Sequence, residues 1–567
     1  YKADADGHTS DPQGDAAFGG IRYEILNKSA YPVFVNGKEI AVDGQALTME
    51  SKVADGVATA SSGAVLPYGT YEVRELSGND SYNDADWSQT FSIRSNGQVV
   101  TFGEAPEWNE DGVKRGTIQI VKADAELNAS TPQGDADLSG AAYDIYTQSK
   151  APVYVQGSWY EKGDKVATVS STWNDSEKAY VASISNLPYG TYEVREAKAP
   201  TGYHQADYSQ TVQIREEGQI VRLNTEETWN EDTVFRGGVS VTKADADLHE
   251  STPQGDATLA GTTYEIINRS ANAVFSKESG EVVAPGEVVL TLTAEWNKTT
   301  ETYMASTGTK SLPYGTYEIR ETGASEGYNN GQWSQTFSIR KDGEMVSLTN
   351  ENPVQRGGIV VGKVDRETGS YHPLGEAHLD GATFEVINRS KAPVYVNGET
   401  FDAGETILTM AAEEMEWNGK TIYGASTGNN VLPYGTYEVR EAGSGTGYLY
   451  NRTSKEYSQT VSIRADGQMA DLTASDKAVS NQVIREDWHF QKKAADSMER
   501  MDQIAFLVTS MTTGERHVIV TDENGTWGSA WLKQSENTNA NDPDSPNSDG
   551  AVAVDENGDW YVADSSK

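Results

Sequence analysis

Leu-Pro-Tyr-Gly-Thr-Tyr-Glu-Val-Arg-Glu, residues 66–75, is the stretch that decides the fold, because almost the same ten residues return at 187–196, 312–321 and 432–441. Pro and Gly stand where a tight turn prefers them, so the first four residues predict a corner that leads directly into a strand. Recurrence of a block along the chain is typical of a protein built from one repeated domain. The sequence therefore predicts tandem copies of one β-rich unit.

Other blocks recur around this stretch in a constant order. Each repeat opens on an alternating strand that ends in Lys, as at 118–122, followed by a loop of the type Pro-Gln-Gly-Asp-Ala. A strand such as 381–386 comes next, and Ser-Gln-Thr-(Phe/Val)-X-Ile-Arg follows later, as at 88–94 and 334–340. One repeat spans about 120 residues, the size of an ordinary sandwich domain. We expect unit 1 at 1–114, unit 2 at 115–235, unit 3 at 236–355, unit 4 at 356–484 and a divergent unit 5 at 485–567.

Alternation with a period of two residues dominates the repeated blocks. In 239–243 the two valines share a face with Lys243, whereas Ser240 and Thr242 point to the other face. This pattern predicts half-buried antiparallel strands and an all-β fold. The connections between units are short, since Asp232 and Lys243 are close in the sequence. We therefore expect an extended and fairly stiff rod.

The composition excludes several classes of function. Asp and Glu number 85 against 45 Lys and Arg, a net charge of -40, so nucleic acids and anionic membrane surfaces should repel the chain. The chain contains no Cys, which excludes disulfides, thiolate zinc sites and a cysteine nucleophile. No apolar run approaches the length of about 18 residues that a membrane-spanning helix needs.

No motif for a metal, a cofactor or an active site is present. The seven histidines are scattered without ligand spacing, and the sequence lacks a Gly-X-Ser-X-Gly elbow. Two Asp-Glu-Asn-Gly stretches, at 522–525 and 555–558, lack the remaining spacing of a calcium loop and predict hairpin turns. We therefore expect no enzyme, no metal and no cofactor.

The strand after the Leu-Pro-Tyr-Gly corner directs a carboxyl group inward. In 71–75 the residues Tyr71, Val73 and Glu75 share one face, so Glu75 is buried if Val73 belongs to the core. The lysine that ends each opening strand lies on the apolar face of that strand in the same way. Each unit thus buries an amine and a carboxyl group, which costs several kcal/mol unless the charges are paired or neutralised.

A third polar position closes each repeat. Four residues before the Arg that precedes the next opening strand stand Asp111, Asp232, Asn352 and Asn481. Asn109, Asn230 and Asn350 lie two residues earlier on the same face, but unit 4 has Val479 there, which weakens that alternative register.

These motifs, together with Gly-Ala-X-Phe-Glu-Val at 381–386 and the Gly-Tyr that follows the Glu strand, resemble the Cna B-type (SpaA-like pilin) domains of Gram-positive surface proteins. The resemblance covers residues 1–484 well and is looser over 485–567. It implies tandem Ig-like or prealbumin-like β-sandwiches on the bacterial cell surface, anchored to the cell wall by signals outside this chain. The first residue is not Met and no signal peptide follows, so we expect the chain to be an internal fragment.

Members of this family form intramolecular isopeptide bonds, so the resemblance implies a Lys–Asp or Lys–Asn cross-link in each complete unit. Burial would lower the Lys pKa and raise the Glu pKa, giving a neutral nucleophile and a proton donor. The alternative is a buried ion pair or a Lys that reaches solvent from the strand end. The expected sets of lysine, promoting glutamate and acceptor are Lys2/Glu75/Asp111, Lys122/Glu196/Asp232, Lys243/Glu321/Asn352 and Lys363/Glu441/Asn481.

Unit 5 departs from the pattern. Trp488, Phe490 and Lys492 alternate as an opening strand does, but neither the Glu strand nor a closing Asp/Asn segment follows before residue 567. We expect Lys492 to be unlinked and unit 5 to be incomplete.

The sequence predicts a structural stalk of an adhesin or pilus-like protein. The alternative is that the repeats themselves bind a host matrix protein or glycan, through loops or exposed aromatic residues such as Trp159 and Trp296. An enzymatic role would require a catalytic region outside this chain.

Overall fold

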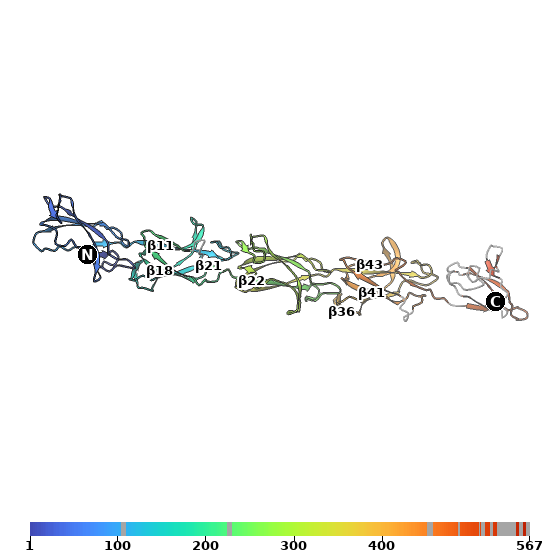
Figure 1. Cartoon of the computed structure of the whole chain (residues 1–567). Coiled ribbons are helices and arrows are strands. Elements are labelled where there is room, and N and C mark those ends of the chain that lie inside the picture. The colour runs from blue at the N-terminus through green and yellow to red at the C-terminus, as the bar shows by residue number, and fades with distance from the viewer. Residues whose placement is uncertain are drawn as a thin grey trace.

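The computed structural model describes residues 1–103, 109–223, 230–450, 457–485, 488–509, 511, 516–521, 526–529, 552–554 and 560–562. Within these residues every regular element is a β-strand. Figure 1 shows the strands gathered into units that follow one another in an extended row. The predicted all-β rod of tandem units is confirmed.

Units 1 and 2 contain the first twenty-one strands. Those of unit 1 are β1 (Lys2–Asp4), β2 (Arg22–Asn27), β3 (Val33–Val35), β4 (Lys38–Ile40), β5 (Gln45–Glu50), β6 (Lys52–Ala54), β7 (Val57–Thr59), β8 (Gly69–Ser77), β9 (Ser88–Ile93) and β10 (Asn109–Asp111). Those of unit 2 are β11 (Arg115–Asp124), β12 (Ala142–Thr147), β13 (Val153–Val155), β14 (Ser158–Tyr160), β15 (Lys165–Ser170), β16 (Thr172–Asn174), β17 (Ala179–Pro188), β18 (Gly190–Lys198), β19 (Ser209–Ile214), β20 (Ile220–Leu223) and β21 (Asn230–Asp232).

Units 3 and 4 repeat this order of strands. Those of unit 3 are β22 (Arg236–Asp245), β23 (Thr263–Asn268), β24 (Val274–Phe275), β25 (Val282–Val283), β26 (Val288–Thr293), β27 (Glu295–Asn297), β28 (Thr302–Ser306), β29 (Leu312–Pro313), β30 (Gly315–Gly323), β31 (Ser334–Ile339) and β32 (Met345–Asn352). Those of unit 4 are β33 (Arg356–Asp365), β34 (Thr383–Asn388), β35 (Val394–Val396), β36 (Glu399–Phe401), β37 (Thr406–Ala411), β38 (Glu413–Trp417), β39 (Lys420–Ser426), β40 (Leu432–Pro433), β41 (Gly435–Gly443), β42 (Ser458–Ile463), β43 (Met469–Leu472) and β44 (Val479–Asn481).

Each of units 2 to 4 is a sandwich of two sheets. In unit 2 one sheet has the order β16-β17-β11-β20, with β21 also paired to β11, and the other has the order β15-β12-β18-β19. Ile118 and Ile120 of the first sheet belong to the same buried cluster as Tyr143 and Ile145 of the second sheet. The core therefore lies between the two sheets, as in other β-sandwiches.

The predicted alternation positions the opening lysine inside this core. On β22 the side chains of Val239, Val241 and Lys243 are buried, whereas Ser240 and Thr242 are partly exposed. The closing strand runs parallel to the opening strand and directly beside it, as in the register Lys122↔Asn230 and Asp124↔Asp232. The same parallel pairing joins β1 to β10, β22 to β32 and β33 to β44. The first and last strands of a unit are thus neighbours.

Unit 5 has a different arrangement in its described part. Its strands are β45 (Trp488–Gln491), β46 (Ala505–Thr509), β47 (Arg516–Val520), β48 (Thr526–Ser529), β49 (Val552–Val554) and β50 (Trp560–Val562). They form the pairs β45-β48, β46-β47 and β49-β50. The hairpin turns predicted at 522–525 and 555–558 lie outside the described residues. Among the described residues, none forms a helix with the length and apolar character needed to cross a membrane.

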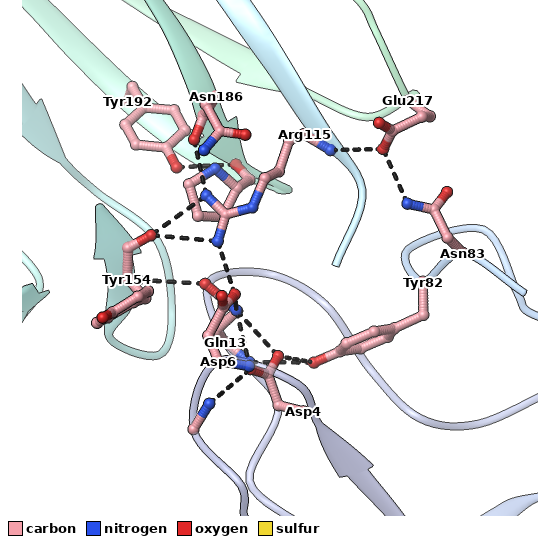
Figure 2. Close-up of polar contacts among 12 residues, drawn as sticks. Asp4, Asp6, Gln13, Tyr82, Asn83, Arg115, Tyr154, Asn186, Tyr192 and Glu217 are labelled. Atoms are coloured by element: carbon pink, nitrogen blue, oxygen red, sulfur yellow. Dashed lines mark hydrogen bonds and ion pairs between the residues drawn. The ribbon is translucent and has the colours of Figure 1, made fainter. Parts of the chain in front are cut away.

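A loop of each of units 1 to 3 is docked on the next unit. Figure 2 shows the first of these junctions, where the Oε1 atom of Gln13 accepts a hydrogen bond from the Tyr154 amide of unit 2 (3.1 Å). The side-chain amide of Gln13 donates to Asp4 (3.0 Å) and Asp6 (2.6 Å), and Asp6 accepts from the Arg115 guanidinium (2.6 Å). The loop is thus held from both units at once.

Candidate cross-linking sites

The structure brings together all four predicted sets of Lys, Glu and Asp/Asn. The lysine ends the buried face of the opening strand, the glutamate comes from the strand after the Leu-Pro-Tyr-Gly corner, and the acceptor comes from the closing strand. The four lysine side chains have at most 1 % of their surface exposed. A buried amine at the end of a strand needs a partner, and each of these amines has polar groups around it.

In units 1 and 2 the amine lies between two carboxyl groups. Lys2 Nζ is 2.7 Å from Glu75 Oε2 and contacts Asp111 Oδ1. In unit 2, Lys122 Nζ is 3.1 Å from Glu196 Oε1 and 2.5 Å from Asp232 Oδ1. The carboxyl groups of both pairs are shielded from solvent. One amine cannot neutralise two buried carboxylates, so this arrangement favours a shared proton.

In units 3 and 4 the acceptor is an amide. Lys363 Nζ contacts Asn481 Oδ1 and lies 3.7 Å from Glu441 Oε1.

Unit 3 has a different local arrangement. Lys243 Nζ donates to the main-chain carbonyls of Asn350 (3.2 Å) and Ala244 (3.4 Å). The side-chain amide of Asn352 donates to Glu321 Oε1 (2.6 Å). The glutamate therefore contacts the nitrogen that would leave if Asn352 were attacked.

Burial shifts the pKa of several of these groups in the predicted directions. It lowers the pKa of Lys243 and of Lys363 to about 8. Burial, assisted by the charge of Asp232, raises the pKa of Glu196 to about 7. Burial likewise raises the pKa of Asp111 to about 7, and it raises the pKa of Asp232. Burial thus favours the neutral amine at Lys243 and Lys363 and the protonated acid at Asp111, Glu196 and Asp232, which are the reactive forms for amide formation.

One oxygen of each acceptor carboxyl group has no hydrogen-bond partner in the described part of the chain. These atoms are Asp111 Oδ2 and Asp232 Oδ2, and both are buried. An ordinary buried ion pair is stable only when its remaining lone pairs are also satisfied. In a condensation, one of the two carboxyl oxygens leaves as water. The arrangement can therefore support attack of the Lys nitrogen on the carboxyl carbon, with formation of a C–N bond and loss of water.

The alternative asparagines also enter the sites. Asn109 Oδ1 accepts from Lys2 Nζ (2.9 Å), and the side-chain amide of Asn350 donates to Glu321 (2.6 Å) and to the Tyr264 hydroxyl (3.0 Å). These residues surround the lysine and the glutamate. The side chain of Asn230 lies outside the described part of the chain. The contribution of Tyr264 was not predicted, because its strand pattern shows only that the ring points inward.

Sequence reasoning also missed a second buried polar cluster, which recurs in units 1 to 3. Asp245, two residues after Lys243, accepts hydrogen bonds from the Tyr328 hydroxyl (2.8 Å) and from the Gln254 side-chain amide (3.0 Å). Tyr328 is the tyrosine of the Gly-Tyr motif, and Gln254 belongs to the Pro-Gln-Gly-Asp loop. Recurrence of these three residues together was the available signal.

Lys492 is partly buried, and its carbonyl accepts from the Met501 amide (3.1 Å). Nothing tests its predicted lack of a cross-link, which stays a prediction. Within the described residues, no group of three or more His, Asp or Glu side chains could hold a metal ion.

The family is indicated by two of the units. Residues 116–229 and 239–353 each match the family model described as SpaA, prealbumin-like fold domain. Units 2 and 3 are thus similar to SpaA-type prealbumin-like domains. Units 1 and 4 share the paired first and last strands and the polar residues of these two domains, so the resemblance predicted from sequence is confirmed in its main feature.

Solved structures with partial similarity to this chain were also found. The Bacillus anthracis TIE protein is 17 % identical, with 82 % of this chain and 69 % of that chain covered and a TM-score of 0.39. BcpA, the major pilin subunit of Bacillus cereus, is 14 % identical over 65 % of this chain and 100 % of its own, with a TM-score of 0.21. The full-length major pilin SpaD from Corynebacterium diphtheriae is 14 % identical over 65 % and 98 %, with a TM-score of 0.18. A search of curated proteins gave no significant match.

Proposed function

We propose that the chain is the structural stalk of a bacterial cell-surface adhesin or pilus-like protein, outside the cell and attached to the cell wall. Its units would be divided after residues 114, 235, 355 and 484, and it would have no enzymatic activity towards other molecules. The match of units 2 and 3 to SpaA-type domains supports this role. The net charge of -40 argues against nucleic acid or anionic membranes as partners.

We further propose that each of units 1 to 4 forms one amide between its opening lysine and its closing Asp or Asn. The observation that carries this proposal is the contact between a buried lysine amine and the buried carboxyl group of Asp111 and of Asp232, whose Oδ2 atom accepts from no N–H or hydroxyl donor among the described residues. In units 1 and 2 the neutral amine attacks the protonated carboxyl group, and one water leaves. In units 3 and 4 it attacks the carboxamide, and one ammonia leaves, with the glutamate transferring the protons.

Intact mass spectrometry tests the proposal. Four cross-links remove two waters and two ammonia molecules from the mass of the linear chain. Peptide mapping should then find each lysine joined to its acceptor. A mass equal to that of the linear chain would show that the four sets are ordinary buried polar clusters.

Replacement of the promoting glutamate provides the specific test. Glu196→Gln keeps the shape of the side chain but removes its proton transfer, so unit 2 should fold and stay unlinked, with its water retained. Glu193→Gln is the matched control, since Glu193 lies on the same strand and faces Arg195 and Ser209 on the outer surface (both 2.8 Å). This control should keep the cross-link. A linked Glu196→Gln chain would contradict the role of the glutamate.

A second candidate function is binding of a host glycan or matrix protein by the repeats. Trp173 of unit 2 and Trp296 of unit 3 occupy equivalent strands, and 46 % and 48 % of their surfaces are exposed. Each packs edge-on against a tyrosine, Tyr180 or Tyr303. Exposed aromatic rings can stack on ligands. Solid-phase binding to matrix proteins and glycans, reduced by Trp173→Ala with Trp296→Ala, would favour this function over a stalk alone.

Trp159 has a structural explanation instead. Its ring lies against Gly7 of unit 1, where an added Cβ atom would come within 3.2 Å of it. It also packs beside Tyr154, a residue of the first junction. Trp159 therefore belongs to the contact between units.

A further inference from the structure

The three junctions between units 1 to 4 use one set of contacts. At the first junction, the Asp15 carboxylate accepts from the Thr191 hydroxyl (2.6 Å) and from the Arg215 guanidinium (3.0 Å). Asp135 makes the same bonds to Thr316 (2.6 Å) and Arg340 (2.9 Å). Asp256 makes them to Thr436 (2.6 Å) and Arg464 (2.9 Å). The Asp of each Pro-Gln-Gly-Asp loop is thus bound by a Thr and an Arg of the following unit.

The backbone of the loop is bound as well. The Gly14 amide donates to the Pro152 carbonyl (2.9 Å), and the Asp15 amide donates to the Tyr189 carbonyl (3.1 Å). Glycines 134 and 255 and aspartates 135 and 256 repeat these bonds at the next two junctions. Each following unit therefore has a receiving face, which consists of its residues equivalent to Pro152, Tyr154, Tyr189, Thr191 and Arg215.

Unit 1 has the same receiving face, formed by Pro32, Phe34, Tyr68, Thr70 and Arg94. Its arginine is already in the binding position, because it donates to the Gly69 carbonyl (2.9 Å) and to the Thr70 hydroxyl (2.9 Å). The guanidinium lies 4.9 Å from the centre of the Tyr68 ring. The equivalent distance in unit 2, from Arg215 to Tyr189, is 4.7 Å. The face is thus preformed.

The apolar residues on this face of unit 1 are exposed. Phe34 and Tyr68 have 65 % and 72 % of their surface accessible, and the adjacent Tyr31 has 79 %. By contrast, Tyr434, the equivalent of Tyr68 in unit 4, is only 6 % exposed because the loop of unit 3 covers it. Clustered exposed aromatic residues with a fixed cation beside them indicate an interaction surface.

We propose that the receiving face of unit 1 binds the Pro-Gln-Gly-Asp loop of a further unit of the same kind, joined in series as units 1 to 4 are. The loops of units 1 to 3 are already engaged within the chain. The corresponding loop of unit 4 reads Pro373-Leu374-Gly375-Glu376 and lacks the Gln and the Asp that the receiving face binds. A second copy of the chain therefore offers no free loop of the required sequence, which favours a unit in series.

An extended chain tests this inference. Residues 115–242, which include the whole opening strand of unit 2, are placed ahead of Lys2 in place of Tyr1. Thr242 then precedes Lys2 as it precedes Lys243, and the added Gln133-Gly134-Asp135 loop can reach the face of unit 1. Hydrogen exchange is then measured in peptides covering 30–35 and 64–71, whose sequences occur once in the extended chain. We expect exchange of these amides to slow by about tenfold or more relative to the original chain.

Two variants of the extended chain identify the contact. Arg94→Ala, or Asp135→Asn in the added segment alone, should return exchange to the rate of the original chain. Arg74→Ala is the matched control, because Arg74 lies on the same unit but pairs with Glu24 away from the face, and it should leave the protection intact. Unchanged exchange in the extended chain would overturn the proposal.

Two further measurements keep the test decisive. The intact mass of the extended chain reports whether the added unit has folded, because its own Lys–Asp cross-link removes one further water. An extension with residues 236–362 replaces it if that water is retained. Sedimentation of the original chain tests the other occupant. Concentration-dependent association that Arg94→Ala abolishes would assign the face to a second copy and overturn binding in series.

Discussion

At the scale of single residues, the identity of the acceptor, Asp or Asn, determines which group of the site has its pKa shifted by burial. Where the acceptor is Asn, burial lowers the pKa of the lysine to about 8, as at Lys243 and Lys363. Where the acceptor is Asp, a second acid shares the site, and burial raises the pKa of Glu196 and of Asp111 to about 7. A buried site avoids isolated charge by either route.

These values predict how cross-link formation in units 3 and 4 depends on pH. Only the neutral amine is a nucleophile, and the neutral fraction of an amine with a pKa of about 8 rises as the pH rises towards 8 and levels off above it. When unlinked chain is refolded over a pH series, the initial rate should rise about tenfold per pH unit below 8. Peptide mapping of Lys243–Asn352 and Lys363–Asn481 at timed intervals measures it.

Tryptophan fluorescence serves as the control, since it must show that refolding itself is complete at each pH before the link forms.

In unit 2 the acid is the group that determines the pH dependence, because Glu196, with a pKa of about 7, loses its proton above that pH and can no longer donate it. Its rate should therefore fall as the pH rises above about 7, where the rates of units 3 and 4 still rise. Equal rates at all pH values would show that lysine deprotonation does not limit the reaction.

At the scale of strands and loops, alternation predicted the site better than it predicted the junctions. The inward positions of Glu75 and Lys243 follow from counting along a strand, because successive side chains point to opposite faces. The contacts of Asn350 with Glu321 depend on how far the closing strand slides along the opening strand, which a single strand pattern does not specify. The docked loops depend mainly on backbone amides and carbonyls, whose partners no residue pattern reveals.

The loop glycines allow a prediction at this scale. Gly134 has a φ of 58°, and a Cβ atom there would lie 2.2 Å from the Tyr314 carbonyl oxygen of unit 3. Gly134→Ala should therefore push the loop away from unit 3, and amide exchange at 271–275 and 314–316 should accelerate by about tenfold or more.

Gly140→Ala is the matched control for this change. Gly140 also has a positive φ, of 78°, but an added Cβ atom would meet nothing within 4 Å. It should cost a similar backbone strain while leaving the exchange of unit 3 unchanged. If both variants accelerate exchange in unit 3 equally, backbone strain rather than contact with Tyr314 is responsible.

At the scale of the whole molecule, the cross-links and the junctions lie on one mechanical path. Lys2 and Asp4 are on the same strand, β1, which lies beside the closing strand β10. Asp4 is bonded to Gln13, and Gln13 accepts from the Tyr154 amide of the next unit. Because the proposed amide joins the first strand of a unit to its last strand, force applied at the two ends of the chain is transmitted through the amide and the junction. The sheets themselves then carry little of the force.

This path predicts the response of single molecules to force. In a linked unit the residues between Lys122 and Asp232 cannot extend, since the covalent bond closes their loop. Glu196→Gln should open this loop and add a single unfolding step of about 110 residues, which is roughly 38 nm at about 3.5 Å per residue. Stretching the chain between its ends by atomic force microscopy should show this additional step in the variant and not in the wild-type chain. The Glu193→Gln chain should behave as the wild type. A step of this length in the wild-type chain would mean that unit 2 unfolds without a covalent restraint and that its Lys–Asp pair remains an ion pair.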